Sequence, residues 1–549
     1  MARVRLISHR RALLPGALTV LGMAVGCTFP PLPDLTDATP RQRIAFNQDS
    51  YGITDNVLIT GATASVTGTI QNTGETTLAG IQVMVSEGGS EFSIATTCPD
   101  TLTALATCSM TVTLDPATVG PKVATLRVSS TQGESDAATV SGMGAAAVAV
   151  TISATGTTGR VTSSPPGIDC TVGTCVHEFT TTSVVLTATD DGNGTLADWG
   201  EATCPATTSC SLPLTMNRSL TADFRAPVSN PIPSTVAGAA AFDPDGSLLV
   251  VTRNQGSSTM SMLRLAGSTL TLLDSGTLGA AARTGYDLSV ATNRVITVVG
   301  AAEVGTAFQP FKTEIHPDLS TETGNLTVSS PGDGASRGVC HDATNRAYVV
   351  GSVADAASMF WANALPGASN WDMLRNTAAT AEAGVARDVA WSTSGFWVVG
   401  ETGAQGWLGR IDGSDGSTVA ETIVPGAAVL TAVAIHGPDI IVAGRQAGTN
   451  APLIRRYTGT LGEAWSRVLS GTADSVQVVV DAPSGATYVA STSSVPVECS
   501  LHKIDGSTGA IVWSRMVSTG SCTALAVNAD GVAVIAATSG SALARKYFH

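Results

Sequence analysis

Charged and aromatic residues are scarce in this chain of 549 residues. Asp, Glu, Lys and Arg make up 13% of it and Phe, Trp and Tyr 5%, whereas hydrophobic residues reach 43%. This composition is too apolar for a disordered chain, and its 57 glycines interrupt long helices. Basic residues number 29 against 43 acidic ones, giving a formal net charge of -14. Because such a surface repels phosphate backbones, it argues against nucleic-acid binding.

Motifs for metal, phosphate or dinucleotide binding are also lacking. The seven His residues have no metal-site spacing, and neither a phosphate loop nor a dinucleotide fingerprint is found. We therefore expect no metal and no cofactor. Gly334–Gly338 matches the Gly-x-Ser-x-Gly string of hydrolases, but a strand pattern follows it instead of the strand-to-helix turn that the motif requires, so we interpret the match as chance.

Long apolar runs are missing after the first 26 residues, so we expect no membrane-spanning helix there. The first 26 residues have four arginines, then the short apolar stretch 12–25, then Gly26 and Cys27. This is typical of a secretory signal. The segment resembles a bacterial lipoprotein signal, although Ala24 stands where that family prefers Leu. The resemblance implies that Cys27 is acylated and that the lipid is the only contact with the membrane; the alternative is an ordinary signal peptide. Thr28 is not the Asp that retains lipoproteins in the inner membrane, which favours the outer membrane or cell surface.

Ten cysteines in an exported chain predict disulfide bonds. Setting Cys27 aside leaves nine. The close neighbours along the chain suggest the pairs Cys98–Cys108, Cys170–Cys175 and Cys204–Cys210, with Cys499–Cys522 across neighbouring strands and Cys340 left over. A zinc site made of Cys170, Cys175, Cys204 and Cys210 is the alternative, and an oxidising compartment argues against it.

Residues 27–42 form a Pro-rich tether, and residues 43–144 show short alternating strands typical of a β-sandwich. The second segment resembles the immunoglobulin-like modules of the Hydin and choice-of-anchor type. The features in common are 72–74 (Asn-Thr-Gly), 92–94 (Phe-Ser-Ile), two cysteines and the terminal Gly142 and Gly144. The resemblance implies a structural or adhesive module without chemistry.

Residues 145–226 form a second small β module. It is similar to a divergent internalin-type B repeat, which carries cysteine pairs at hairpin tips, a Trp before the second pair and an aromatic residue in the last strand. The matching aromatic residues are Trp199 and Phe224. Asp190, Asp191 and Asn193 could chelate calcium, but this stretch is more simply a Gly-rich turn.

Residues 227–549 repeat with a period of roughly 47 residues, as four-stranded propeller blades do. Seven apolar strands each end in a small residue, namely Thr252, Gly300, Gly351, Gly400, Gly444, Ser491 and Ala537. The segment resembles bacterial β-propeller repeats. Because the last unit stops after its third strand, we expect residues 228–236 to complete a seven-bladed propeller. Their prolines suit an edge strand.

Three arginines at the start of successive innermost strands are candidates for an anion site. Arg283, Arg337 and Arg387 could converge on a carboxylate or sulfate in the channel. The alternative is that each pairs locally with an aspartate such as Asp287, Asp342 or Asp388.

The sequence thus predicts an all-β, lipid-anchored cell-envelope protein whose propeller binds a protein or polysaccharide ligand without catalysis. One alternative is a hydrolase or lyase working in the propeller funnel. A charged cluster with perturbed titration there would favour the enzyme, and a channel lined by Ala, Val and Ser would oppose it. A second alternative is a purely structural envelope protein, which would retain no partner in a pull-down.

Overall fold

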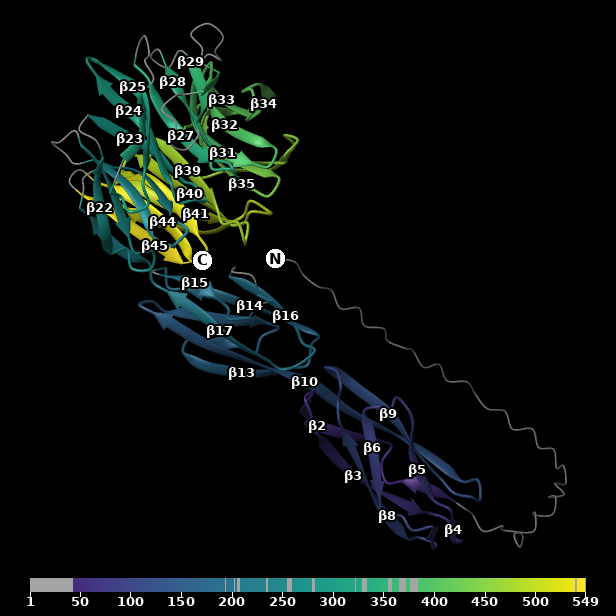
Figure 1. Cartoon of the computed structure of the whole chain (residues 1–549). Helices are drawn as coiled ribbons and strands as arrows, with labels where there is room; N and C mark the ends of the chain where they lie inside the picture. Colours follow the sequence, from purple (N-terminus) through teal and green to yellow (C-terminus); the bar gives the residue numbers. More distant parts are fainter. Residues whose placement is uncertain are drawn as a thin grey trace, which may run out of the picture. The chain divides into compact units, whose positions relative to one another are not determined.

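The structure is a computed structural model, and it divides the chain into two units. It describes residues 43–192, 194–201, 203–204, 208–233, 236–253, 259–278, 282–320, 322–327, 333–353, 358–364, 372–375, 384–538 and 541–548 (Figure 1). The first unit takes most of residues 43–141, and the second takes residues 142–549 together with Thr54–Ala64 and Asp115–Lys122. In the described residues no helix is long and apolar enough to cross a membrane. The predicted signal, tether and Cys27 lie outside the described residues.

The first unit is built of short antiparallel strands. One sheet has the order β1 (Ile44–Phe46), β3 (Ala64–Asn72), β8 (Thr107–Leu114), β6 (Phe92–Thr96). The other strands are β2 (Ser50–Leu58), β4 (Leu78–Ala79), β5 (Gln82–Glu87), β7 (Thr101–Leu102), β9 (Gly120–Ser129) and β10 (Ser135–Thr155). Every second residue of β8 and β9 is buried. This alternation follows from strand geometry and places the apolar side chains in one core.

The predicted module of residues 145–226 falls in the same unit as the repeat segment. The end of β10 pairs in parallel with β17 (Arg218–Arg225) and antiparallel with β13 (Gly173–Phe179). The remaining strands are β11 (Gly159–Ser164), β12 (Asp169–Cys170), β14 (Ser183–Asp190), β15 (Thr195–Asp198) and β16 (Ser209–Pro213). Trp199 and Phe224 are fully buried in its core, which also holds two disulfides, as so small a core requires.

The repeat segment forms seven four-stranded antiparallel sheets within the described residues. The first strands are β19 (Val236–Phe242), β23 (Arg283–Val290), β27 (Ala335–His341), β31 (Val385–Ser392), β35 (Ala427–His436), β39 (Ser475–Val480) and β43 (Ser521–Asn528). The second strands are β20 (Leu248–Arg253), β24 (Ile296–Val304), β28 (Ala347–Val353), β32 (Gly395–Thr402), β36 (Asp439–Gln446), β40 (Thr487–Ser494) and β44 (Gly531–Ala537). The third strands are β21 (Met260–Leu265), β25 (Ala307–Ile315), β29 (Ser358–Ala364), β33 (Gln405–Ile411), β37 (Pro452–Tyr457), β41 (Val497–Ile504) and β45 (Ala542–Phe548).

The fourth strands show how the ring of sheets begins and ends. Six of them follow their third strands directly: β22 (Leu272–Leu278), β26 (Glu322–Thr327), β30 (Asp372–Arg375), β34 (Thr418–Ile423), β38 (Glu463–Val468) and β42 (Ile511–Ser518). In the last sheet β18 (Val228–Ile232), from the start of the segment, pairs antiparallel with β45. Successive first strands contact one another from β19 to β43, and β43 contacts β19 again. The sheets thus surround a common axis, which is the arrangement of a β-propeller.

The small residue expected to end each second strand lies inside that strand in six of the seven sheets, and where it is glycine it has a steric cause. In six of the first strands one extra residue interrupts the pairing with the second strand, as a β-bulge does. In the affected sheets a backbone carbonyl of the first strand then lies close to the second strand. A Cβ atom on Gly300 would stand 1.9 Å from the Thr284 carbonyl oxygen, and one on Gly351 would stand 2.1 Å from that of Ala335. Only glycine fits these positions without a backbone shift.

Four disulfide bonds cross-link the described residues. They join Cys98 to Cys108, Cys170 to Cys175, Cys204 to Cys210 and Cys499 to Cys522. Cys340 is free and buried in β27. The four cysteines weighed as a zinc site are thus in disulfides instead. The predictions of an all-β chain, a β-propeller and disulfide bonds are confirmed.

Candidate functional site

The extra residues of the first strands face a cavity at the centre of the ring. Counting back 13 or 14 residues from the small residue of each second strand gives one position per sheet; the small residues are Thr252, Gly300, Gly351, Gly400, Gly444, Ser491 and Ala537. All seven line the same cavity: Gly238, Tyr286, Arg337, Arg387, Thr431, Gln477 and Thr523. We call this set the inner ring. Its members lie far apart in sequence, and they meet because the first strands surround the axis.

Polar side chains join neighbouring sheets around this cavity, where the first strands contribute few mutual backbone pairs. The backbone N–H of Val339 donates to Oδ2 of Asp287 at 2.8 Å, and that of Val433 donates to Oδ2 of Asp388 at 2.8 Å. The Thr431 hydroxyl likewise donates to the Val476 carbonyl. These bonds satisfy backbone groups that would otherwise be unpaired in a narrow space.

Arg337 is a half-buried charge of the inner ring. Its guanidinium carbon lies 5.8 Å from the centre of the Tyr286 ring, a cation–π distance. No described side chain forms an ion pair or hydrogen bond with it, and its Nε atom is buried without a partner. Burial, and then the nearby charge of Arg387, lower the pKa of Arg337 from its ordinary value. An anion that binds to a buried, unpaired guanidinium stabilises its charged form.

Arg387 lies in the same cavity but has a counter-ion. Its Nη2 atom donates to Oε1 of Glu401 at 2.5 Å. Arg283, the third arginine of the predicted anion site, does not line the cavity. It is only 8% exposed, and its guanidinium stacks on the Phe311 ring at 5.2 Å. The structure therefore brings two of the three arginines together. Neither of these two forms an ion pair with the aspartates considered as local partners.

The two aspartates of the cavity wall have unusual titration. Desolvation by burial raises the pKa of Asp388 to about 7. Burial, and then repulsion by Asp388, raise the pKa of Asp287 well above its ordinary value. Both oxygens of each carboxylate accept backbone N–H groups, from Leu288 and Val339 for Asp287 and from Val389 and Val433 for Asp388. Because burial raises both pKa values, each of these carboxylates carries less negative charge near neutral pH than an ordinary aspartate does.

A second cavity shares Tyr286 and Arg337 with the first. The central cavity has a volume of about 270 Å³ and the second about 420 Å³. The second is lined by hydroxyl-bearing Thr284 and Ser352, by Arg253 and by the ring of Phe308. Phe308 and Tyr286 are 46% and 42% exposed. Aromatic surface next to an unpaired guanidinium is suited to an acidic ligand with an apolar face.

Tyr286 was missed by reasoning from the sequence, although a signal for it exists. Alignment of the units on Gly300, Gly351 and Gly400 places Tyr286 level with Arg337 and one residue from Arg387, and places Arg283 three residues away from Tyr286. Choosing arginines by charge alone therefore selected the wrong member in this unit. Ser336 of the hydrolase-like string lies inside β27 and is fully buried, in a strand and not at a strand-to-helix turn.

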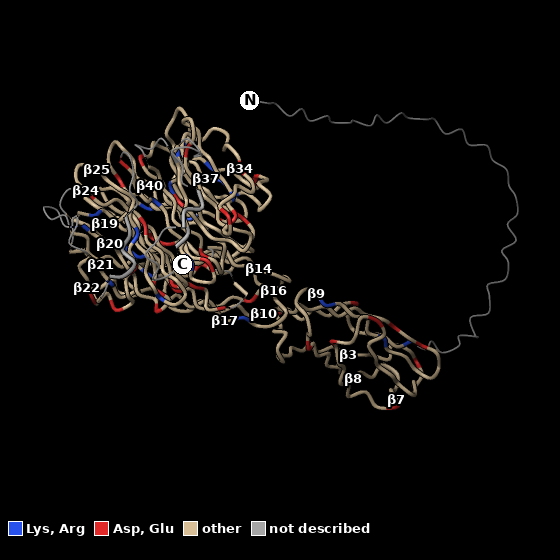
Figure 2. The backbone as a smooth tube through the Cα atoms, turned by 45° about the horizontal axis from the view of Figure 1, so that its top comes forward, with Lys and Arg blue, Asp and Glu red and all other residues tan. Residues whose placement is uncertain are grey.

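The described residues contain no group of three or more His, Cys, Asp or Glu side chains that could hold a metal ion. Of the calcium candidates, Asp190 accepts from Arg515 at 2.6 Å, and Asp191 accepts from Thr157 and Thr158. Asn193 is outside the described residues. Charged residues are scattered along the chain trace, with uncharged stretches between them (Figure 2).

Fold and site together define a β-propeller with a polar cavity on its axis. No family model and no curated protein matches the chain. Among solved structures, it is similar to the β-propeller domain of Cps50 (Swd1) from Myceliophteria thermophila at 10% identity, a TM-score of 0.43 and coverage of 58% of this chain and 99% of that one. It is also similar to hydrazine synthase from Kuenenia stuttgartiensis at 12% identity, a TM-score of 0.43 and coverage of 57% and 96%.

Proposed function

We propose that this chain is an exported, lipid-anchored cell-envelope protein that binds a protein or polysaccharide ligand and catalyses no reaction. In this proposal Cys27 carries the lipid, and the tether and the immunoglobulin-like and B-repeat-like modules form a stalk. The stalk presents a seven-bladed propeller closed by Val228–Ile232. The membrane is contacted through the lipid alone, and nucleic acid is not a partner.

The observation that carries the binding role is the unpaired guanidinium of Arg337 in the cavity wall. A protein with so few charges has little reason to desolvate an arginine beside a second arginine unless an anion neutralises it. Arg387 is already paired with Glu401, so Arg337 is the arginine of this cavity that has no ion-pair partner among the described residues. The ligand we propose is therefore an acidic polymer that places a carboxylate or sulfate against Arg337 and an apolar face against Tyr286 and Phe308.

Binding to polymers of defined charge tests the proposal. The probes are polygalacturonate, polyglutamate and dextran sulfate, with uncharged dextran for comparison. We expect the acidic polymers to bind and dextran to bind more weakly at the same salt concentration. Replacing Arg337 and Arg387 by Ala should weaken acidic-polymer binding by at least about tenfold, because each charge-assisted hydrogen bond is worth about 1.5–3 kcal/mol.

Arg160→Ala is the matched control. Arg160 is an exposed arginine paired with Asp169 in the small β module, far from the axis in sequence. Its loss should leave binding unchanged. Equal binding by wild type and the double variant, or failure of the wild type to bind any acidic polymer, would refute the anion site.

One observation favours the enzymatic alternative, a hydrolase or lyase in the funnel. Asp287 and Asp388 form a buried acidic pair with raised pKa values in the cavity, which is the kind of cluster that catalysis uses. A structural role is the alternative for this pair, because each carboxylate oxygen already accepts a backbone N–H and two of these bonds join neighbouring sheets. Cleavage of any of the acidic polymers by the purified protein, lost in Asp388→Asn, would establish the enzyme.

A further inference from the structure

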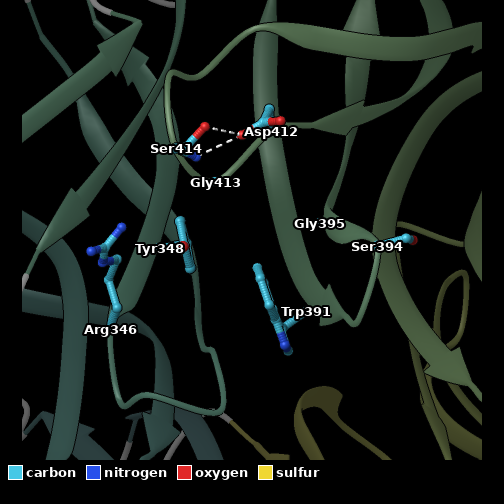
Figure 3. Close-up of a pocket in the computed structure, with 8 residues that line it drawn as sticks. All are labelled: Arg346, Tyr348, Trp391, Ser394, Gly395, Asp412, Gly413 and Ser414. Atoms are coloured by element: carbon cyan, nitrogen blue, oxygen red, sulfur yellow. Dashed lines mark hydrogen bonds between the residues drawn. The ribbon is translucent and has the colours of Figure 1, made fainter.

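A third pocket, distinct from the two cavities described above, lies where β31 ends. It has a volume of about 300 Å³ and is lined by residues of three separate segments (Figure 3). These are Arg346, Tyr348, Trp391, Ser394, Gly395, Asp412, Gly413 and Ser414. Trp391 stands four residues after Arg387 on β31, which corresponds to roughly 13 Å along a strand. The pocket is therefore distinct from the central cavity.

Three stacked aromatic rings form one wall of this pocket. Trp391 stacks on Tyr348 with ring centres 5.4 Å apart and an interplanar angle of 7°. Tyr348 in turn stacks on Phe396 at 4.6 Å. The two inner rings are buried, whereas Trp391 is half-buried and forms the outer end of the stack. Its indole N–H has no hydrogen-bond partner among the described residues, so the ring offers both an apolar face and a free donor.

Polar groups of both charges surround this ring. Arg346 lies beside Tyr348 (Figure 3), and its Nε atom is buried without a partner among the described residues. Across the pocket Oδ1 of Asp412 accepts from the backbone N–H and the hydroxyl of Ser414. These bonds hold the loop 412–414 and lower the pKa of Asp412, which is therefore an ionised acceptor at the rim.

The corresponding junction two sheets further on has a different structure. There the loop of Asp505 and Gly506 follows β41 as the loop of Asp412 follows β33. Arg456 of the preceding sheet donates to the Gly506 carbonyl and forms an ion pair with Asp439. Asp439 stands at the position in its sheet that Arg346 has in the sheet of β27 to β30. Among the described residues Arg346 has no such counter-ion. The two junctions therefore differ in their charges and hydrogen bonds.

We propose that this pocket binds one sugar residue of a saccharide ligand. A pyranose has an apolar face that fits a tryptophan ring and hydroxyl groups at its edge that both donate and accept. Here Trp391 supplies the ring, Asp412 accepts hydroxyl protons, and Arg346 and the indole N–H donate to sugar oxygens. A volume of 300 Å³ is at the small end of ligand pockets and suits a single residue or a chain end. The site is separate from the anion site of the proposed function and does not depend on it.

Ligand-observed and protein-observed NMR on the full chain test this assignment. The probes are glucose, galactose, mannose, xylose, rhamnose and N-acetylglucosamine. We expect saturation transfer from the protein to at least one of them and a saturable shift of one indole N–H signal among the eight tryptophans. Assignment of that signal to Trp391 follows from its absence in Trp391→Phe.

The variants separate this site from the other cavities. Trp391→Ala and Arg346→Met should each abolish transfer or weaken the affinity by at least about fivefold, and Trp391→Phe should retain most of it. The matched control is Met516→Ala, which removes an exposed apolar side chain from the outer strand β42 and should leave sugar binding unchanged. The proposal is overturned if no sugar shifts the Trp391 signal in the wild type, or if folded Trp391→Ala binds as the wild type does. Loss of acidic-polymer binding in the arginine variants bears on the other site alone.

Discussion

At the scale of single residues, the inner-ring position of the first strands carries different side chains in different sheets. Tyr286, Arg337 and Arg387 occupy equivalent places on the cavity wall, where the extra residue of each strand faces the axis. In two of these sheets the next residue is an aspartate that accepts the backbone N–H of the following sheet. Of two neighbouring residues, one thus faces the cavity and the other joins the sheets.

The raised pKa of Asp388 predicts a specific pH dependence of stability. The pKa is 3.8 for an ordinary Asp and about 7 here, so between these values the folded chain holds a proton that the unfolded chain has lost. The stability from this group is therefore present at low pH and is lost as the pH rises towards 7, at about 1.4 kcal/mol per pH unit. Asp388→Asn, which cannot ionise, should be less stable than wild type at pH 5, and this difference should narrow by pH 8.

The difference between wild type and variant is the diagnostic quantity, because other groups act in the opposite direction. Burial lowers the pKa of His341 and of His502 to about 4, so those residues make the fold more stable as the pH rises from 4 to 6.5. Denaturant unfolding of both proteins at several pH values measures the difference. A constant gap from pH 5 to pH 8 would contradict the assignment.

At the scale of elements, the ring depends on a strand borrowed from the start of the segment. Pairing of β18 with β45 covers an edge that would otherwise expose a row of backbone donors and acceptors. Pro231 fits there because an outer strand needs fewer ladder hydrogen bonds. Ile232 is 4% exposed and packs in the core between the first and last sheets with Ile535 and Leu263.

Ile232→Ala should destabilise the propeller by about 2–5 kcal/mol, since it leaves a cavity at the closing strand. The control is Ile423→Ala on the outer strand β34, where Ile423 is 39% exposed and the cost should stay within about 0.5 kcal/mol. Unfolding followed by tryptophan fluorescence measures both, since most of the tryptophans lie in the ring. Equal effects of the two substitutions would mean that β18 adds little to closure.

At the scale of the whole molecule, the four disulfides and the predicted N-terminal signal favour the same compartment. Short closed loops such as Cys170–Cys175 form and persist in oxidising surroundings. Lipid attachment at Cys27 stays a prediction, because that residue lies outside the described part of the chain.

Cys27→Ser should move the protein from the membrane fraction to the soluble fraction of the cell envelope, because one signal peptide without acylation gives no stable anchor. Fractionation with labelling by a radioactive fatty acid measures the change. Ser substitution at Cys340, which is buried and free, is the control and should leave both label and membrane association intact. Membrane association of the unlabelled Cys27→Ser protein would contradict a lipid anchor.

Much of the fold could be predicted because its signals are local. Alternating apolar residues mark strands, and a glycine recurs in four of the second strands because a carbonyl of the bulged first strand leaves no room for a side chain. The three close disulfide pairs were also predictable from a local signal. Their cysteines are five to ten residues apart, and so short a loop keeps its two ends near each other.

The composition of the candidate site could not be predicted in full, because its residues are far apart in sequence and meet only in the folded ring. Arg337 and Arg387 share a cavity with Tyr286 and not with Arg283, because a single added residue in each of these three first strands decides which side chain faces the axis. The pocket of Trp391 joins the ends of three segments from two sheets. By itself the sequence determined the strands, the repeat and the sheets that they form, which follow from neighbours along the chain. Only the tertiary structure decided which side chains share a cavity, because closing the ring brings together positions some 50 residues apart.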